Sequence, residues 1–297
     1  MVASRLRILG ALAAAVIVAG AVAGACSSSE ETGKPAGTPV ANVADDQLNV
    51  KGKLIVCADM PYPPQEFLDE SGNPTGSDIE IAQALADRLG LTLQVENTVW
   101  DTIIQALSTG KCDLIISAMT ITDDRAEQID FIPYFVAGQA FVVLKDNPEN
   151  ITSVDDLCGK AVAAETGTTE DQSLRGTDAY EGKGLSDACV AKGKEAIEIQ
   201  TYQKDSDALL ALQTNKVDAY FTDSPVAAYQ VTEHGDSFQL VPGLLLDTAP
   251  EGIGVPKDKT GLKDAVKTAL KAMIDDGSYM AILEKYELQD GAVTSVE

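Results

Sequence analysis

The first residues that could do chemistry lie in the stretch SAMTITDDRAEQIDF, residues 117–131, directly after a short apolar run. Thr122 is placed to cap a helix, and Asp123 suits the first turn, because the helix dipole favours acids there. Arg125 then falls near the positive end of this helix, where a cation is unfavourable by about 0.3–1 kcal/mol. Arg125 therefore needs an anion to face. Either a surface acid such as Glu127 or Asp123 supplies it, or a bound anionic group does.

The chain has few residues that could support histidine or cysteine chemistry. The only histidine is His234, and none of the five cysteines belongs to a CxxC pair. A zinc site or a cysteine–histidine nucleophile is therefore not expected, and we predict no metal and no cofactor. His234 is most simply a residue at the end of a helix, before a glycine.

Composition limits the size of the protein and the choice of partners. The chain has 297 residues, of which 45% are apolar, enough for two domains of ordinary size. Its formal charge is −24, from 22 basic and 46 acidic residues. Such a protein should repel polyanions, so no nucleic-acid partner is expected.

The N-terminus has the features of an export signal. Two arginines precede 18 uncharged residues, 8–25, that end in small residues before Cys26. We expect residues 1–25 to be a signal peptide, with a membrane anchor as the alternative. The AGAC run resembles a bacterial lipobox, in which Cys26 becomes the lipidated first residue. Residues 26–48 are rich in Ser, Gly, Pro and acids and predict a flexible tether, so the body would be extracytoplasmic and anchored to the cell membrane as a lipoprotein.

Strand and helix patterns alternate along the rest of the chain. Buried strands are predicted at 53–59, 91–97 and 112–118, with helices at 77–90 and 100–110 between them. The same rhythm returns later in the chain. Further strands are predicted at 135–144, 159–169, 196–202, 217–223 and 251–257. Further helices are predicted at 206–216, at 225–235 and within 261–288. This order predicts two α/β units, each with a mostly parallel sheet and helices on its faces.

Polar residues gather where these strands end. Asp59 ends the first strand, residues 117–120 follow the third, and residues 166–169 and Asp223 end strands of the second unit. Open α/β sheets bind ligands at the carboxyl ends of their strands. The sequence therefore predicts a small-molecule site in a cleft between two lobes.

Six motifs follow one another in the body of the chain. They are CADMPYPPQEF (57–67), GSDIEIAQAL (76–85), WDTIIQALSTGKCDLIISAMTITDDRAEQIDF (100–131), GKAVAAETGTT (159–169), VDAYFTDSPVAAY (217–229) and AMIDDGSYMAILEKY (272–286). Their order and spacing, over about residues 50–290, resemble bacterial extracellular solute-binding proteins of family 3. These are the substrate-binding lipoproteins of amino-acid ABC transporters, with the type 2 periplasmic-binding fold.

The resemblance implies an α/β fold of two lobes, each a mostly parallel sheet with helices on both faces. Lobe 1 would comprise residues 49–138 plus 249–297, and lobe 2 residues 139–248. Two strands, near 136–141 and 246–251, would form the hinge. The lobes would close on a ligand like a hinged trap.

The resemblance also assigns roles in the site. Arg125 would fork onto the α-carboxylate of an amino acid, aided by backbone amides at Thr120 and Thr169. Asp223 would accept from the α-ammonium, with the carbonyl of Ala118 and the hydroxyl of Thr120. The alternative for Asp223 is to cap the helix that follows it. The ligand-binding residues implied are Asp59, Tyr62, Trp100, Ala118, Thr120, Arg125, Glu165, Thr169 and Asp223, with Tyr62 and Trp100 as walls around the side chain.

The expected ligand follows from a charge count. Arg125 gives +1, while Asp223, Asp59 and Glu165 give −3, a net of −2. The ligand's α-groups would take up Arg125 and Asp223, which leaves Asp59 and Glu165 facing the side chain with no protein cation. Buried unpaired carboxylates are costly, so a basic amino acid is expected over a polar one such as glutamine. The alternative is that Glu165 points to solvent and the pocket is neutral.

The implied function is binding of a free amino acid and its delivery to the permease of an ABC transporter. Two alternatives stay open: a ligand-sensing subunit, and an enzyme such as a dehydratase on the same fold. An enzyme needs a general acid or base, for which Glu66 or Glu165 could be proposed. We expect no enzymatic activity and a monomer.

The four cysteines of the body allow disulfides in an exported protein. Cys158 and Cys189 flank a Gly-rich excursion, and we predict a bond that closes a loop of about 30 residues. Cys57 and Cys112 lie on strands expected to be neighbours, where buried thiols would also be stable. Their bonding is left open.

Overall fold

The computed structural model describes residues 39–176 and 184–296 of the chain. The expected signal peptide, Cys26 and residues 26–38 of the expected tether lie outside the described residues. In the part of the chain that is described, no helix is both long enough and apolar enough to cross a membrane.

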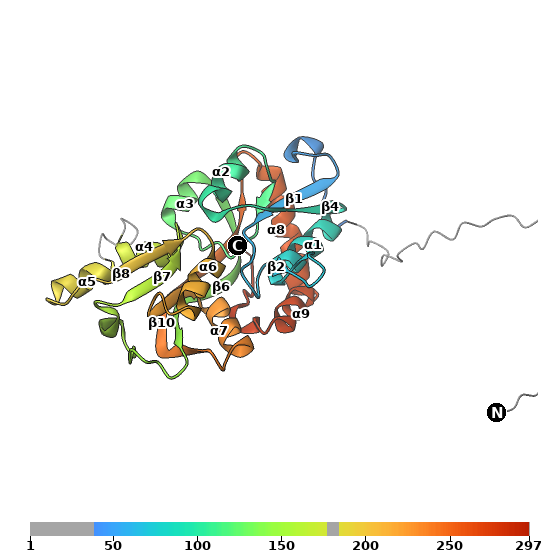
Figure 1. The fold of residues 1–297 in the computed structure, drawn as a ribbon. Helices are drawn as coiled ribbons and strands as arrows, with labels where there is room; N and C mark the ends of the chain where they lie inside the picture. The colour runs from blue at the N-terminus through green and yellow to red at the C-terminus, as the bar shows by residue number, and fades with distance from the viewer. Residues whose placement is uncertain (1–38, 177–183, 297) are drawn as a thin grey trace, which may run out of the picture. The chain divides into compact units, whose positions relative to one another are not determined.

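Eight strands of the described residues form one mixed sheet in the order β4-β1-β5-β10-β6-β9-β7-β8 (Figure 1). Strand β1 pairs in parallel with β4 and β5, which form the first half, and β7 pairs in parallel with β8 and β9, which form the second half. The long strands β6 and β10 run antiparallel between the two halves. This topology confirms the predicted α/β class, with the two parallel groups joined in one mixed sheet rather than in two separate sheets. The strands are β1 (Lys53–Ala58), β4 (Thr92–Asn97), β5 (Leu114–Ile115), β6 (Asp130–Leu144), β7 (Ala161–Glu165), β8 (Glu198–Tyr202), β9 (Ala219–Asp223) and β10 (Phe238–Val255), and a separate hairpin has β2 (Phe67–Leu68) and β3 (Pro74–Thr75).

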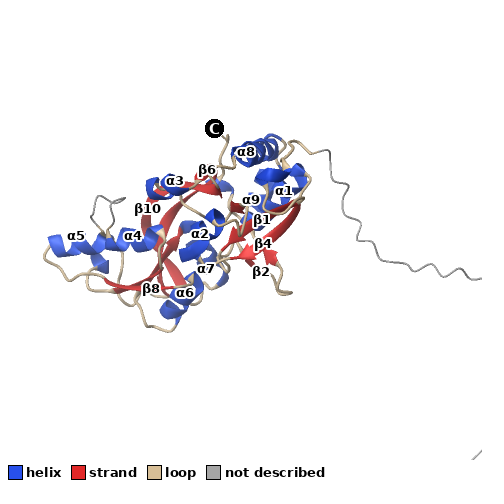
Figure 2. Cartoon of the chain, turned by 90° about the horizontal axis from the view of Figure 1, so that it is seen from above, coloured by secondary structure: helices blue, strands red, loops and turns tan. Residues whose placement is uncertain are grey.

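Helices cover both faces of the sheet (Figure 2). Helices α1, α8 and α9 pack together beside the first half, whereas α4 and α6 pack against β7 and β8 of the second (Figure 1). The helices are α1 (Ser77–Leu89), α2 (Ile103–Ser108), α3 (Asp123–Gln128), α4 (Thr169–Arg175), α5 (Leu185–Ala191), α6 (Asp205–Gln213), α7 (Ser224–Glu233), α8 (Thr260–Asp275) and α9 (Ser278–Lys285).

The apolar runs of the sequence form the core on both faces of the sheet. On one face of β1, Leu54 packs in a cluster with Ile81 of α1. On the other face, Ile55 packs with Ile103 of α2. Burial on both faces explains why β1 is a continuous apolar run rather than an alternating one.

Helix α1 lies where the sequence predicts it, but neither of its first two residues, Ser77 and Asp78, caps it. The N-cap is Gly76, with a φ of 114° that favours glycine. Asp78 is instead buried, and it accepts hydrogen bonds from the N–H of Ala118 at 2.9 Å and the hydroxyl of Tyr134 at 2.6 Å. Asp78 therefore fixes the loop that follows β5 rather than the helix end.

Residues 39–48, assigned to the tether from the sequence, contact the body. Ala41 and Val43 pack against the core of the first half, and Leu48 is buried. The N–H of Val40 also donates to the carbonyl of Arg88 at 2.8 Å. The chain thus contacts the body from about residue 40 onward.

Both pairs of body cysteines form disulfide bonds. Cys158 and Cys189 are joined, with their Cα atoms 5.5 Å apart, as the sequence predicts. Cys57 and Cys112, left open by the sequence, are joined as well, with a Cα separation of 5.7 Å. Each bond lies within one half of the sheet, so neither restrains one half against the other.

Candidate functional site

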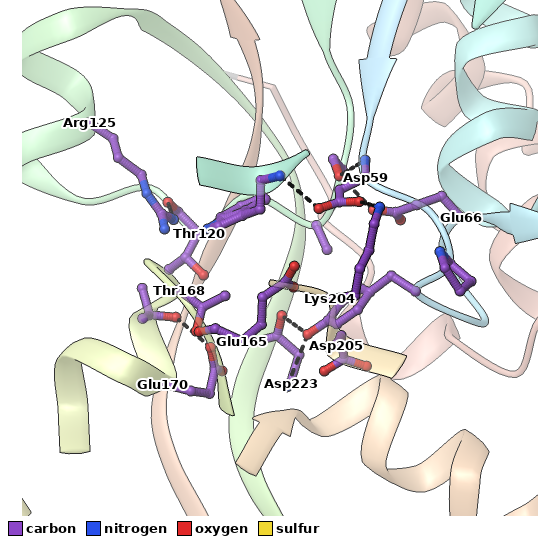
Figure 3. A pocket seen from close by; sticks show the side chains of 16 residues that line it. Asp59, Glu66, Thr120, Arg125, Glu165, Thr168, Glu170, Lys204, Asp205 and Asp223 are labelled. Atoms are coloured by element: carbon purple, nitrogen blue, oxygen red, sulfur yellow. Dashed lines mark hydrogen bonds and ion pairs between the residues drawn. The ribbon is translucent and has the colours of Figure 1, made fainter. Parts of the chain in front are cut away.

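A cavity lies at the carboxyl ends of strands from both halves (Figure 3). This is the place where open α/β sheets bind small molecules. All nine residues predicted to bind the ligand line it: Asp59, Tyr62, Trp100, Ala118, Thr120, Arg125, Glu165, Thr169 and Asp223. The lining also has residues outside the predicted set: Pro61, Glu66, Ser117, Thr168, Glu170, Lys204 and Asp205.

Arg125 reaches the cavity from the first turn of α3. The N-cap Thr122 accepts a hydrogen bond from the N–H of Arg125 at 3.3 Å, as the sequence predicts. The guanidinium donates to the carbonyl of Thr120 at 2.8 Å and lies 5.0 Å from the ring centre of Trp100. Because Arg125 is only 7% exposed, a surface ion pair with its acidic neighbours does not explain its position.

The start of α4 faces the same cavity from the second half. The carbonyl of Gly167 accepts from the Arg125 guanidinium at 3.4 Å. Gly167 has a φ of 78°, which lets the chain turn sharply from β7 into α4. Thr168 caps this helix, and Thr169 begins it and is buried. A cationic side chain and a helix start thus meet at one wall, which suits an anion.

Asp223 ends β9 on another wall of the cavity. The hydroxyl of Tyr62, from the first half, donates to its carboxylate at 2.8 Å and contacts the hydroxyl of Thr222 at 3.0 Å. Asp223 is the N-cap residue of α7, but its side chain makes no capping hydrogen bond, so capping does not account for its position. Burial and the negative charge of Glu251 raise the pKa of Asp223 to about 8. A ligand ammonium would remove that penalty.

Asp59, Glu165 and Lys204 form what we call the side-chain end of the cavity. The ammonium of Lys204 pairs with Asp59 and donates to the carbonyl of Met60 at 2.9 Å. The second carboxylate oxygen of Asp59 accepts from the N–H of Trp100 at 2.7 Å. In Figure 3, Glu165 lies between this pair and Arg125.

Two parts of the predicted charge count need correction. Asp59 was counted without a protein cation, which is wrong because Lys204 pairs with it. The alternative that Glu165 points to solvent is also wrong, because Glu165 is 6% exposed and one of its oxygens has no hydrogen-bond partner. Burial, with the charges of Asp205 and Asp59, raises the pKa of Glu165 to about 10.

Lys204 and Asp205 could have been found by the rule that found the other residues. They follow the carboxyl end of β8, where ligand-binding residues of open α/β sheets lie. Asp205 accepts from the hydroxyl of Tyr220 at 2.5 Å, and burial raises its pKa to about 7. Glu66 is named from the sequence only as an acid for the enzyme alternative, and Glu170 is not named, although it directly follows the polar residues 166–169.

Buried carboxyls continue beneath the cavity. Glu66 accepts from the hydroxyl of Ser117 at 2.7 Å, and Glu251 accepts from the amide of Gln65 at 2.7 Å. Burial raises the pKa of both acids well above the usual range, and the charge of Asp78 adds to it. Burial thus disfavours the charged form of both acids, a penalty that a nearby cation would offset.

Together, the fold and the cavity define a two-part α/β protein with a small-molecule site at the strand ends of its two halves. The chain belongs to the bacterial extracellular solute-binding proteins, family 3, whose family model matches residues 54–289. It is 30% identical to the L-cystine-binding protein TcyJ of Escherichia coli strain K12, over 84% of this chain and 90% of the relative. It is 29% identical to the arginine-binding protein ArgT of Corynebacterium glutamicum, over 90% of this chain and 87% of the relative.

A solved structure gives the same picture of the fold. It is an ancestral arginine-binding protein bound to arginine, with a TM-score of 0.70 and 36% identity, covering 80% of this chain and 98% of its own. The comparison confirms the predicted type 2 periplasmic-binding fold.

Proposed function

We propose that this chain binds a free amino acid outside the cytoplasm and delivers it to the permease of an ABC transporter. The observation that carries the proposal is one cavity in which buried Arg125 and buried Asp223 come from the two different halves. A zwitterion between them would pair its carboxylate with the guanidinium and its ammonium with the acid. It would also hold closed the two lobes, 49–138 plus 249–297 and 139–248, about the strands β6 and β10.

We propose a cationic side chain for the ligand, with a neutral amide second and an acidic side chain last. With every side chain counted in its ionised form, the predicted residues and Lys204 give +2 from Arg125 and Lys204 and −3 from Asp223, Asp59 and Glu165, a net of −1. Glu66, Glu170 and Asp205 also line the cavity and add further acids. Once Lys204 pairs with Asp59, Glu165 is the acid of the side-chain end left for the ligand, and one of its oxygens lacks a donor. A cation satisfies that oxygen best. The similarity to arginine-binding relatives agrees with this choice, and the similarity to a cystine-binding protein adds a longer polar ligand to the test.

Isothermal titration calorimetry against the twenty amino acids and cystine tests the proposal. We expect arginine or lysine to bind tightest, glutamine more weakly, and glutamate not at all. Tight glutamate binding without a response to arginine or lysine would overturn the ligand class while keeping the function. No heat with any of these compounds would overturn the function itself.

We also propose that binding involves no chemical conversion. Glu165 is a carboxyl with a pKa near 10, so it could act as a general acid if a reactive substrate entered. Incubation with the tightest ligand, followed by chromatography, should return that ligand unchanged. Recovery of a converted product would favour the enzyme alternative.

The anchor is a separate proposal, which rests on the sequence alone. We propose that the chain is cleaved before Cys26, acylated on that cysteine, and monomeric. Mass spectrometry of membrane-extracted protein should find a diacylglyceryl adduct on Cys26. An unmodified N-terminus at another residue would contradict it.

A further inference from the structure

Lys204 links the two halves of the sheet across the cavity. It is the N-cap residue of α6 and follows β8, at one edge of the sheet. Its ammonium pairs with Asp59, which follows β1 near the opposite edge, and donates to the carbonyl of Met60 at 2.9 Å. The pair therefore bridges the two halves.

Asp59 is already satisfied by the protein on both oxygens. One pairs with Lys204 and the other accepts from the N–H of Trp100 at 2.7 Å. The Asp59 side chain is 7% exposed, so without a counter-ion its charge would be costly. A ligand with a cationic side chain therefore meets a subsite in which Asp59 is already paired.

The ammonium of Lys204 is also able to move away from Asp59. Its side chain is 28% exposed, against 7% for Asp59, and a lysine stem has four rotatable carbons and a strongly hydrated head. A ligand cation that displaced it would return the ammonium to water. Displacing Lys204 breaks its ion pair with Asp59, whereas a ligand with a neutral side chain leaves that pair in place.

We propose that Lys204 is a specificity-determining residue, a tethered cation that occupies the place of a ligand's cationic group at Asp59. The inference rests on the proposed amino-acid-binding function and deepens it. Lys204 lowers the preference for cationic over neutral ligands, because it neutralises Asp59 whichever ligand enters. It also holds the empty protein closed, since its ion pair spans the cavity.

The test compares arginine with citrulline, its neutral analogue, by calorimetry on the full mature chain. Lys204→Met keeps the length of the side chain and removes its charge. The ratio of the citrulline Kd to the arginine Kd should rise by about tenfold or more, because Asp59 then needs the ligand's cation. Asp59→Asn should lower the same ratio. A ratio in Lys204→Met within twofold of the wild-type value overturns the inference.

Two controls separate this role from a structural one. Lys216→Met removes an exposed lysine just after α6 and should leave the ratio unchanged. Lys204→Arg keeps the charge and should stay close to wild type, whereas Lys204→Gln also removes the charge and stands in if Lys204→Met does not fold. A shifted ratio in Lys216→Met, or a tenfold rise in Lys204→Arg, counts against Lys204 as the cause.

Small-angle X-ray scattering of the ligand-free protein gives a readout that needs no ligand. The radius of gyration should be larger in Lys204→Met than in wild type and unchanged in Lys216→Met. Equal radii in all three overturn the bridging role. If wild type binds no amino acid at all, the proposed function fails and the specificity role fails with it, while the scattering result still decides the bridge.

Discussion

Arg125 is a cation at the start of a helix, and its surroundings compensate for that position. Helix α3 has six residues, so its dipole is small, and the first carboxyl side chains of the turn point outward as exposed acids. The guanidinium is instead held by the carbonyl of Thr120 and lies against Trp100. Holding an arginine in this way pre-organises its planar fork for a carboxylate.

Loss of this fork should abolish binding. Arg125→Ala should weaken the tightest amino-acid ligand by roughly 100-fold or more, because one partner of a buried charge pair is removed. Arg125→Lys should keep only part of the affinity, because an ammonium cannot pair in a bidentate manner. Calorimetry measures both, with Arg88→Ala as a control that breaks a surface pair with Asp276 instead. Near wild-type affinity in Arg125→Ala would show that the carboxylate binds elsewhere.

Glu165 makes binding of a cationic ligand depend on pH. Its pKa of about 10 means that the empty protein holds this proton at neutral pH. A ligand cation favours the carboxylate, so the pKa falls on binding, a proton is released, and the affinity rises with pH up to about 10. Arginine titrations at pH 8 in buffers of different ionisation enthalpy should show net proton release. Glu165→Gln should release less, and proton uptake by wild type would contradict the assignment.

At the scale of elements, most of the site residues lie where strands end. The rule that ligands bind at the carboxyl ends of strands led from the sequence to Asp59, Ala118 and Asp223, which do line one cavity. The predicted site uses the ends of β1, β5, β7 and β9 but not the end of β8, so it lacks Lys204. The effect of Glu251 on the pKa of Asp223 could not be predicted. It depends on which distant segments the hinge strand β10 brings beside Glu251.

Element boundaries were predicted less well, for physical reasons. The third predicted strand, 112–118, contains only β5 (Leu114–Ile115), because the chain leaves the sheet and reaches Ala118 with a φ of 45°. The start of α1 depends on a backbone approach at Gly76 that side-chain types do not reveal. Long apolar runs and helix periodicity, by contrast, reflect burial directly, which is why the order of elements is right.

The disulfide in the second half should stabilise α5 against the segment before β7. Cys158 and Cys189 are 31 residues apart, and closing such a loop is worth roughly 3–4 kcal/mol in the chain-entropy description. Replacing both with serine should lower the free energy of unfolding in urea by about that amount. The control is non-reducing peptide mapping of wild type, which should recover both the Cys57–Cys112 and the Cys158–Cys189 peptides. Free thiols at Cys158 and Cys189 would refute the pairing.

At the scale of the molecule, carboxyls of the described residues form a continuous buried group around and below the cavity. Burial raises the pKa of each, to about 6 for Asp78, 7 for Asp205, 8 for Asp223 and 10 for Glu165. Glu66, Glu170 and Glu251 are raised well above the usual range. Burial therefore favours the protonated form of these acids over the charged form.

This group should make the ligand-free protein most stable in mild acid. Unfolded carboxyls titrate near pH 4, so between pH 4 and the folded pKa values the folded state binds more protons than the unfolded state. Stability is therefore lost as pH rises, by about 1.4 kcal/mol per pH unit for each such group until its folded pKa is reached. Urea unfolding at fixed 0.5 M salt, which screens the formal charge of −24, should give a lower free energy at pH 9 than at pH 5. Glu165→Gln should flatten the slope, whereas Asp69→Asn should not, because hydrogen bonds from the backbone of Asn73 lower the pKa of that exposed acid and move its titration below this window. A free energy of unfolding that rises from pH 5 to pH 9 would mean that these carboxyls are ionised in the folded protein rather than protonated.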